Sequence, residues 1–186
     1  MKAAKRTVKP VLAAGGIVVR DAPEPLIAIV RLRKDKAWVL PKGKLKANEN
    51  ALAAAKREVL EETGHEVSVH EFLGSMSQAA GSKPKIVEFW RMRAVGGPVR
   101  KLMRDVKSVK WLPLDQAIGT LTHAHEQAFL ANVGPTAIAA AARSARDVPL
   151  DAGEQPVRDH TGEPPAHSSL VETILSWFRR MMEGRA

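Results

Sequence analysis

Three carboxylates, Glu58, Glu61 and Glu62, fall within five consecutive residues. On a helix, positions i, i+3 and i+4 lie on one face, so these side chains would form a single patch. Carboxylates this close repel one another, and the arrangement is best explained by a hard cation that prefers oxygen ligands, such as Mg²⁺. The spacing therefore favours a metal-binding patch on a helix.

The neighbouring residues predict that helix. Asn50 is a suitable N-cap, residues 51–55 are strong helix formers, and Gly64 stands where a left-handed residue commonly ends a helix. Arg57 lies one turn before Glu61, where a guanidinium can hold a carboxylate through a forked hydrogen bond. We therefore expect a capped helix from about residue 51 to 63 that carries a cation beside its carboxylates.

The stretch that contains this helix resembles the signature of the Nudix hydrolases, G-x5-E-x7-R-E-U-x-E-E-x-G-U, in which U is aliphatic. Eight positions within 22 residues match it: Gly43, Glu49, Arg57, Glu58, Val59, Glu61, Glu62 and Gly64. Only the last position departs, because His65 stands where an aliphatic residue is usual. So many identities at set spacing are far more specific than a lone glycine motif, and they disfavour the alternative of a merely solvated, charged helix.

The resemblance covers roughly residues 10 to 133 and implies an α/β/α sandwich with a mixed central sheet. It also implies hydrolysis of a phosphoanhydride bond in a substrate built as a nucleoside diphosphate linked to another group. The implied cofactor is Mg²⁺, with Mn²⁺ as the alternative ion. Such an ion withdraws charge from phosphate oxygens and acidifies an attacking water.

The same resemblance assigns roles to individual residues. Those expected at the metal are Gly43, through its backbone carbonyl, Glu58, Glu61 and Glu62, while Glu49 and Arg57 brace the loop and the helix. The general base differs among branches of the family, so Glu61 and Glu62 are both candidates. Asp105, six residues before Trp111, is a third candidate, and its alternative role is that of an ordinary loop aspartate.

Basic and aromatic residues are the candidates for binding substrate: Arg31, Arg33, Trp38, Lys42, Lys44, Lys85 and Trp90. Lys42 and Lys44 stand beside the carboxylate patch, where they could hold phosphate oxygens or simply form a solubilising loop. The chain has no tyrosine to stack on a nucleobase. Phe89 and Trp90 are adjacent on a predicted strand, so at most one of them faces a cleft.

Three further stretches, WVLPKGK, KIVEFW and WLPLDQA, are most similar to the branch that holds dinucleoside polyphosphate hydrolases and enzymes acting on oxidised nucleotides. Diphosphoinositol polyphosphate hydrolases are an alternative, and removal of pyrophosphate from RNA 5′ ends is a weaker one. A non-catalytic module that binds nucleotide or RNA is an alternative of another class. Such modules tend to lose the glutamates that this chain retains.

Composition limits the remaining classes. The 186 residues are 45% hydrophobic, include no cysteine and carry a formal charge of +9, which suits an enzyme with a real core and anionic partners. The absence of cysteine excludes disulfides, thiolate nucleophiles and zinc-thiolate sites. No apolar run is long enough to span a bilayer, and the basic N-terminus lacks the apolar region of a secretory signal, so a cytoplasmic protein is expected.

Around the signature helix, hydrophobic alternation and turn residues predict strands at residues 11–20, 26–33, 38–40, 66–70, 85–93 and 109–112. The stretch Phe72–Gly74 is expected to lead into a turn. Short helices are expected at residues 114–118 and 122–133, the second stopped by Gly134 and Pro135. His123 and His125 are two residues apart and do not share a helix face, which disfavours a metal-ligand role.

The expected organisation has five parts: a basic arm at 1–10, the Nudix domain at 11–134, an alanine-rich helix at 135–146, a polar linker with four prolines at 147–167 and an amphipathic helix at 168–186. The apolar stripe of the last helix must be buried against something. Docking on the domain or pairing with a second subunit is favoured over an acidic membrane surface. A nucleic-acid partner is less favoured than a small polyphosphate.

Overall fold

The computed structural model describes residues 9–80 and 83–143, without the side chains of residues 79 and 80. Most of the predicted basic arm, the linker and the C-terminal amphipathic helix lie outside these residues. The strands are β1 Val11–Arg20, β2 Leu26–Leu32, β3 Trp38–Val39, β4 Lys42–Lys44, β5 Glu66–Ala80, β6 Lys83–Val95 and β7 Val106–Leu112. The helices are α1 Ala51–Thr63, α2 Leu114–Thr120 and α3 Ala124–Arg143.

The strands of this described part form one mixed sheet in the order β3-β2-β1-β6-β5, with β4 paired to β1 and β7 paired to β2. β1 and β6 run parallel, and the other pairs are antiparallel. β1 and β2, both predicted as strands, form an antiparallel hairpin. β1 therefore lies at the centre, bonded on one side to the hairpin partner and on the other to β6.

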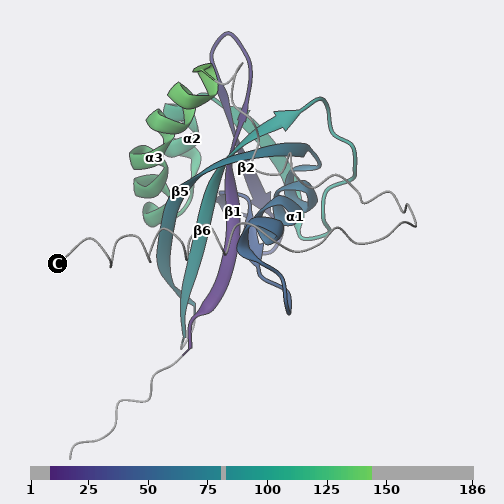
Figure 1. The fold of residues 1–186 in the computed structure, drawn as a ribbon, viewed down its shortest axis with the longest axis vertical. Helices are drawn as coiled ribbons and strands as arrows, with labels where there is room; N and C mark the ends of the chain where they lie inside the picture. Colours follow the sequence, from purple (N-terminus) through teal and green to yellow (C-terminus); the bar gives the residue numbers. More distant parts are fainter. Residues whose placement is uncertain (1–8, 81–82, 144–186) are drawn as a thin grey trace, which may run out of the picture. The chain divides into compact units, whose positions relative to one another are not determined.

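Helices cover both faces of the sheet. Figure 1 shows α1 on one side and α2 with α3 on the other. Successive residues of β1 point to opposite faces, so Ile17 and Val19 pack with α2 and α3 while Ala14 and Val18 pack with α1. The α/β/α sandwich expected from the resemblance is confirmed. Within the described residues, no helix is both long enough and apolar enough to cross a bilayer.

Gly15 and Gly16 of β1 allow the segment before β4 to pack closely against the central strand. A Cβ at Gly15 would lie 2.3 Å from the backbone oxygen of Pro41, and the N–H of Gly16 donates to that same oxygen at 3.2 Å. Any side chain at Gly15 would push away the segment that leads into β4. The lack of a side chain at Gly15 therefore allows the loop before the signature helix to lie against the central strand.

The prediction that Gly134 and Pro135 stop a helix is wrong, because α3 continues through both to Arg143. Proline inside a helix removes one hydrogen bond, but the helix is alanine-rich on both sides and buries Val133 and Ala137 against the sheet. Gly134 has a packing role, since a Cβ there would lie 2.5 Å from a methyl carbon of Leu114 in α2. The glycine lets two helices touch.

The prediction that Phe72–Gly74 leads into a turn is also wrong. β5 runs without interruption to Ala80, and its register with β6 shifts between Val69 and Phe72 and again before Gly74. Gly74 has a φ of +137°, which glycine tolerates. The residues that resemble a turn are thus accommodated as irregularities within a long edge strand.

Candidate active site

Helix α1 begins and ends where its sequence predicts. The side chain of Asn50 accepts a hydrogen bond from the backbone N–H of Ala53 at 2.8 Å, and Gly64 adopts a φ of +76° with its N–H bonded to the carbonyl of Leu60. These caps satisfy backbone groups that helix ends leave free. The carboxylates of the signature are therefore carried on a rigid element.

Arg57 connects the signature residues to one another. Its Nε and Nη2 donate to the two carboxylate oxygens of Glu49 at 2.7 and 2.8 Å. Its Nη1 donates to Glu58 at 2.6 Å and to Glu61 at 3.1 Å. This guanidinium holds the pKa of Glu49 down at about 2, and the pKa of Arg57 is raised in return. The expected bracing of loop and helix is present in the structure.

Glu58 lies directly against the backbone of Gly43. A Cβ at Gly43 would be 2.0 to 2.2 Å from the carboxylate atoms of Glu58, so the acid occupies the space that any other residue would fill. This places β4, the element that carries Gly43, in contact with α1 at the signature carboxylates.

Glu62 is the most perturbed acid of the group. It is 6% exposed, and the backbone N–H of Lys42 donates to its Oε2 at 2.9 Å. Burial, with a smaller contribution from the negative charges of Glu58 and Asp105, raises the pKa of Glu62 to about 8 against the effect of that hydrogen bond. Burial opposes the ionised form of this carboxyl, so a nearby positive charge would strongly favour its ionisation.

These residues fit a hard divalent ion by their chemistry. Within the described residues, no three acidic or histidine side chains form a ready-made metal cluster, and Arg57 holds the carboxylates of Glu58 and Glu61 instead. Yet all the donors are oxygens, as Mg²⁺ and Mn²⁺ prefer. Glu62 is buried with a raised pKa beside a second carboxylate, which is the environment that a cation relieves.

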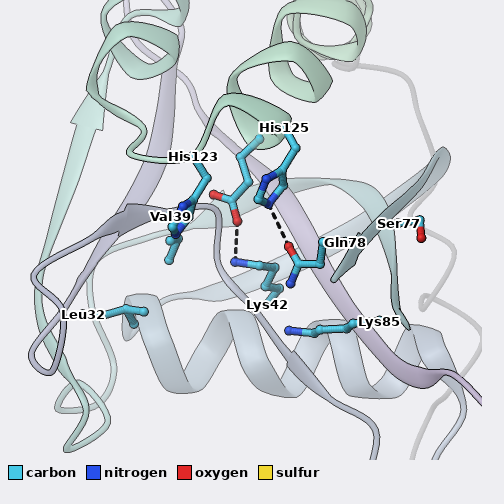
Figure 2. A pocket seen from close by; sticks show the side chains of 9 residues that line it. Leu32, Val39, Lys42, Ser77, Gln78, Lys85, His123 and His125 are labelled. Atoms are coloured by element: carbon cyan, nitrogen blue, oxygen red, sulfur yellow. Dashed lines mark hydrogen bonds and ion pairs between the residues drawn. The ribbon is translucent and has the colours of Figure 1, made fainter. Parts of the chain in front are cut away.

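A cavity of about 550 Å³ is lined by Lys42 of β4 and by residues at the start of α3 (Figure 2). Its lining residues come from six secondary-structure elements and the loop before α3: Leu32, Val39, Lys42, Ser77, Gln78, Lys85, His123, His125 and Glu126. Lys42 and Lys85 are predicted substrate-binding residues. Burial, followed by the charges of Lys42 and Lys44, holds the pKa of Lys85 below its ordinary value.

Glu126 is a functional candidate that sequence reasoning misses. Its side chain is 1% exposed and lies 2.7 Å from the Nζ of Lys42. Its second oxygen accepts from the backbone N–H of Leu40 at 2.9 Å. The charge of Lys42 is therefore balanced inside the protein. Nothing local in the sequence signals this pair, because its members are separated by most of the domain.

The histidines form one wall of the cavity. The Nε2 of His125 lies 2.8 Å from the Oε1 of Gln78, and Figure 2 shows the two side chains pointing toward each other. The rings of His123 and His125 stack with their centres 5.4 Å apart. This wall offers flat faces and hydrogen-bonding groups, and the contact of His125 with Gln78 joins the start of α3 to β5.

The other predicted substrate-binding residues do not line the cavity. Trp90 is 8% exposed and packs beneath α1, on the opposite face from Phe89. Trp38 is flanked by two cations, Arg31 at 5.8 Å and Lys110 at 4.9 Å from its ring centre. The structure also leaves Arg33 and Lys44 exposed outside the cavity. Only two of the seven predicted residues thus meet there.

Asp105 lies on the loop before β7. Its side chain is exposed, and its backbone oxygen accepts from the N–H of Arg33 at 2.8 Å. Its charge contributes to the raised pKa of Glu62, so the two carboxylates are within electrostatic reach. The role of Asp105 as general base stays a prediction.

His65, the one departure from the signature, is fully accommodated. Its Nδ1 lies 2.8 Å from the carbonyl oxygen of Thr63 and must be the donor there, which leaves Nε2 to accept from Arg20 at 2.7 Å. The ring also meets Trp111 edge-on at 5.2 Å. A polar cluster therefore replaces the aliphatic contact, and α1 keeps its position.

The family model of the NUDIX domain matches residues 9–132. The match covers well over half of the chain, and the chain belongs to this family.

Curated relatives carry nucleotide-related names. The chain is 32% identical over 136 residues to an 8-oxo-(d)GTP phosphatase from Mycolicibacterium smegmatis, covering 68% of this chain and 41% of the relative. It is 35% identical over 85 residues to a bis(5′-nucleosyl)-tetraphosphatase (asymmetrical) from Rattus norvegicus, covering 43% and 58%. The chain spans about half the length of the curated relatives that it matches.

Solved structures share the fold. A C. elegans Ap4A hydrolase, solved as a binary complex, superposes with a TM-score of 0.62 at 24% identity over 68% of this chain and 96% of that chain. A MutT protein from Methanosarcina mazei Go1 gives 0.59 at 22% identity over 69% and 96%. At this level of identity the likeness shows the Nudix fold.

Proposed function

We propose that the protein is a metal-dependent pyrophosphohydrolase that cleaves a phosphoanhydride bond in a nucleotide, either a dinucleoside polyphosphate or an oxidised nucleoside triphosphate. The observation that carries the proposal is the carboxylate group of α1, in which Arg57 holds Glu58 and Glu61 while buried Glu62 faces β4. A binding module has no need for a buried acid with a pKa near 8. The names of the curated relatives support the same reaction class.

In this proposal Glu58, Glu61, Glu62 and the carbonyl of Gly43 hold Mg²⁺ or Mn²⁺. When bound, the ion would neutralise negative charge on the phosphate oxygens and make the attacking water more acidic. Arg57 keeps two of the glutamates oriented through its hydrogen bonds, and Lys85 at the cavity offers a cation to phosphate oxygens. Glu61, Glu62 and Asp105 remain the candidates for taking the proton from water.

The cavity favours a nucleoside over an inositol polyphosphate. An inositol polyphosphate requires several uncompensated cations, whereas the charge of Lys42 is already balanced by Glu126 at 2.7 Å. The stacked imidazoles of His123 and His125 and the amide of Gln78 suit a flat, polar, uncharged group such as a nucleobase. In this proposal the two histidines, and not Trp90, stack on the nucleobase.

The test is product analysis with Mg²⁺ on a panel of substrates: diadenosine tetraphosphate, 8-oxo-dGTP, ordinary nucleoside triphosphates, ADP-ribose, a diphosphoinositol polyphosphate and 5′-triphosphorylated RNA. We expect turnover of one of the first two, and we expect Glu62→Gln to lower kcat by at least about 100-fold while the protein stays folded. Tight binding of a nucleotide without turnover of any compound would instead establish a binding module.

A further inference from the structure

Glu126 lies in the first turn of α3, across the sheet from the signature helix. Its carboxylate is buried, and each oxygen has its own donor, the Nζ of Lys42 and the backbone N–H of Leu40. The ammonium of Lys42 also donates to the carbonyl of Leu40 at 3.2 Å. Residues 40–42 are therefore held from the side of α3 by a set of mutually satisfied polar groups.

The same short segment is held from the side of α1 by a second acid. The backbone N–H of Lys42 donates to Glu62 at 2.9 Å, and the next residue, Gly43, lies against the carboxylate of Glu58. Lys42 thus meets one buried glutamate through its side chain and another through its backbone. A shift of this residue would change the surroundings of both signature carboxylates.

We propose that Glu126 is a positioning residue for the α1 carboxylates, acting through Lys42 to hold residues 40–43 against Glu58 and Glu62. The kinetic part of this inference rests on the proposed hydrolase function. Stability alone explains the pair poorly, because a buried ion pair often stabilises a fold no more than apolar residues of the same size. What the pair does provide is a defined geometry at the residue that contacts Glu62.

The first test uses Glu126→Gln, Lys42→Met and the double variant. The two donors meet different oxygens of Glu126, so a glutamine would present its oxygen to one donor and its NH₂ group, which cannot accept, to the other. We expect Glu126→Gln to lower kcat by roughly 10- to 100-fold with little change in KM, as for a misplaced catalytic group. If Glu126 acts through Lys42, the effects of the two substitutions on kcat will not add in the double variant.

Rates are compared at temperatures where circular dichroism shows each variant to be fully folded, since a purely structural role would leave the kcat of folded protein unchanged. Glu71→Gln is the matched control. It removes the carboxylate that pairs with buried Arg91 at 2.8 Å. Neither residue lines the cavity, so the substitution should leave kcat within about twofold of the parent protein. A kcat for Glu126→Gln that is equally unchanged, or additive effects in the double variant, would overturn the proposal.

A second readout needs no activity. Amide hydrogen exchange at Lys42 reports its bond to Glu62, and we expect protection there to fall roughly 10-fold in Glu126→Gln but not in Glu71→Gln. Unchanged protection at Lys42 would refute the positioning role. If the unmodified protein turns over no nucleotide, the proposed function fails, while the exchange result still decides the inference about Glu126.

Discussion

Single residues set the electrostatics of the site, and Arg57 and Glu62 show two opposite ways of doing so. Arg57 lowers the pKa of Glu49 to about 2 through a direct hydrogen bond, so that acid is ionised under all ordinary conditions. Burial raises the pKa of Glu62 to about 8. The first acid is a permanent brace, and the second stays protonated near neutral pH until a positive charge reaches it.

We predict that Glu62 makes the metal-free protein less stable as pH rises. Its pKa is raised from 4.5 to about 8 on folding, so between these values the unfolded chain loses a proton that the folded chain keeps, and unfolding becomes easier. Glu62→Gln should therefore stabilise the protein above pH 8, by a few kcal/mol, and have little effect below pH 4.5. Urea unfolding in EDTA across this range measures the difference.

The control is Glu66→Gln, which removes an exposed carboxylate close to the end of the same helix. If Glu62→Gln changes the free energy of unfolding equally at low and high pH, burial of the ionised acid is not the cause.

Among the secondary-structure elements, the contact of β1 with the segment before β4 depends on Gly15. We predict that Gly15→Ala destabilises the protein by roughly 2 kcal/mol or more, because the new methyl group meets the backbone oxygen of Pro41 at 2.3 Å and backbone cannot move aside as a side chain can. Thermal unfolding measures the loss.

Gly119→Ala is the companion substitution, since a Cβ at this position in α2 meets no atom within 4 Å. It should be neutral or slightly stabilising. Equal stability of the two alanine variants would mean that Gly15 can be relieved by a small shift of the loop.

Elements defined by local chemistry could be predicted from the sequence, and those defined by distant contacts could not. Asn50 and Gly64 act on their own helix, so α1 was predictable at both ends. Gly134 resembles a helix stop, but its neighbour Leu114 in α2 gives it a packing role within α3. The sequence around Gly134 contains no sign of that contact.

At the scale of the whole molecule, the carboxylate patch could be predicted from the sequence, whereas the cavity could not. The signature residues lie within 22 positions, so their spacing alone indicated a shared face. The cavity joins residues from Leu32 to Glu126, and only the packing of α3 over the sheet brings Gln78 to His125. The family resemblance supplied the fold, but it did not supply this wall.

The formal charge of +9 leads to a prediction for the complete chain. If the substrate is an anionic polyphosphate, long-range attraction should raise the rate of encounter, and salt should screen it. We expect kcat/KM to fall several-fold between about 50 and 300 mM NaCl while kcat changes little, because the Debye length falls well below 10 Å at the higher value. Steady-state kinetics in NaCl and in potassium acetate separate screening from an effect of chloride. A flat profile would argue against electrostatic steering.

Gly43 shows how one contact can restrict the evolution of a position. Its φ is not in the left-handed region, so its backbone conformation would suit many amino acids. What excludes them is the carboxylate of Glu58, which lies 2.0 to 2.2 Å from where a Cβ would stand. Every codon change that replaces this glycine introduces a Cβ, so no substitution at this position is conservative. We therefore expect residue 43 to change only where Glu58 has first been lost or moved, because the two side chains would compete for the same space.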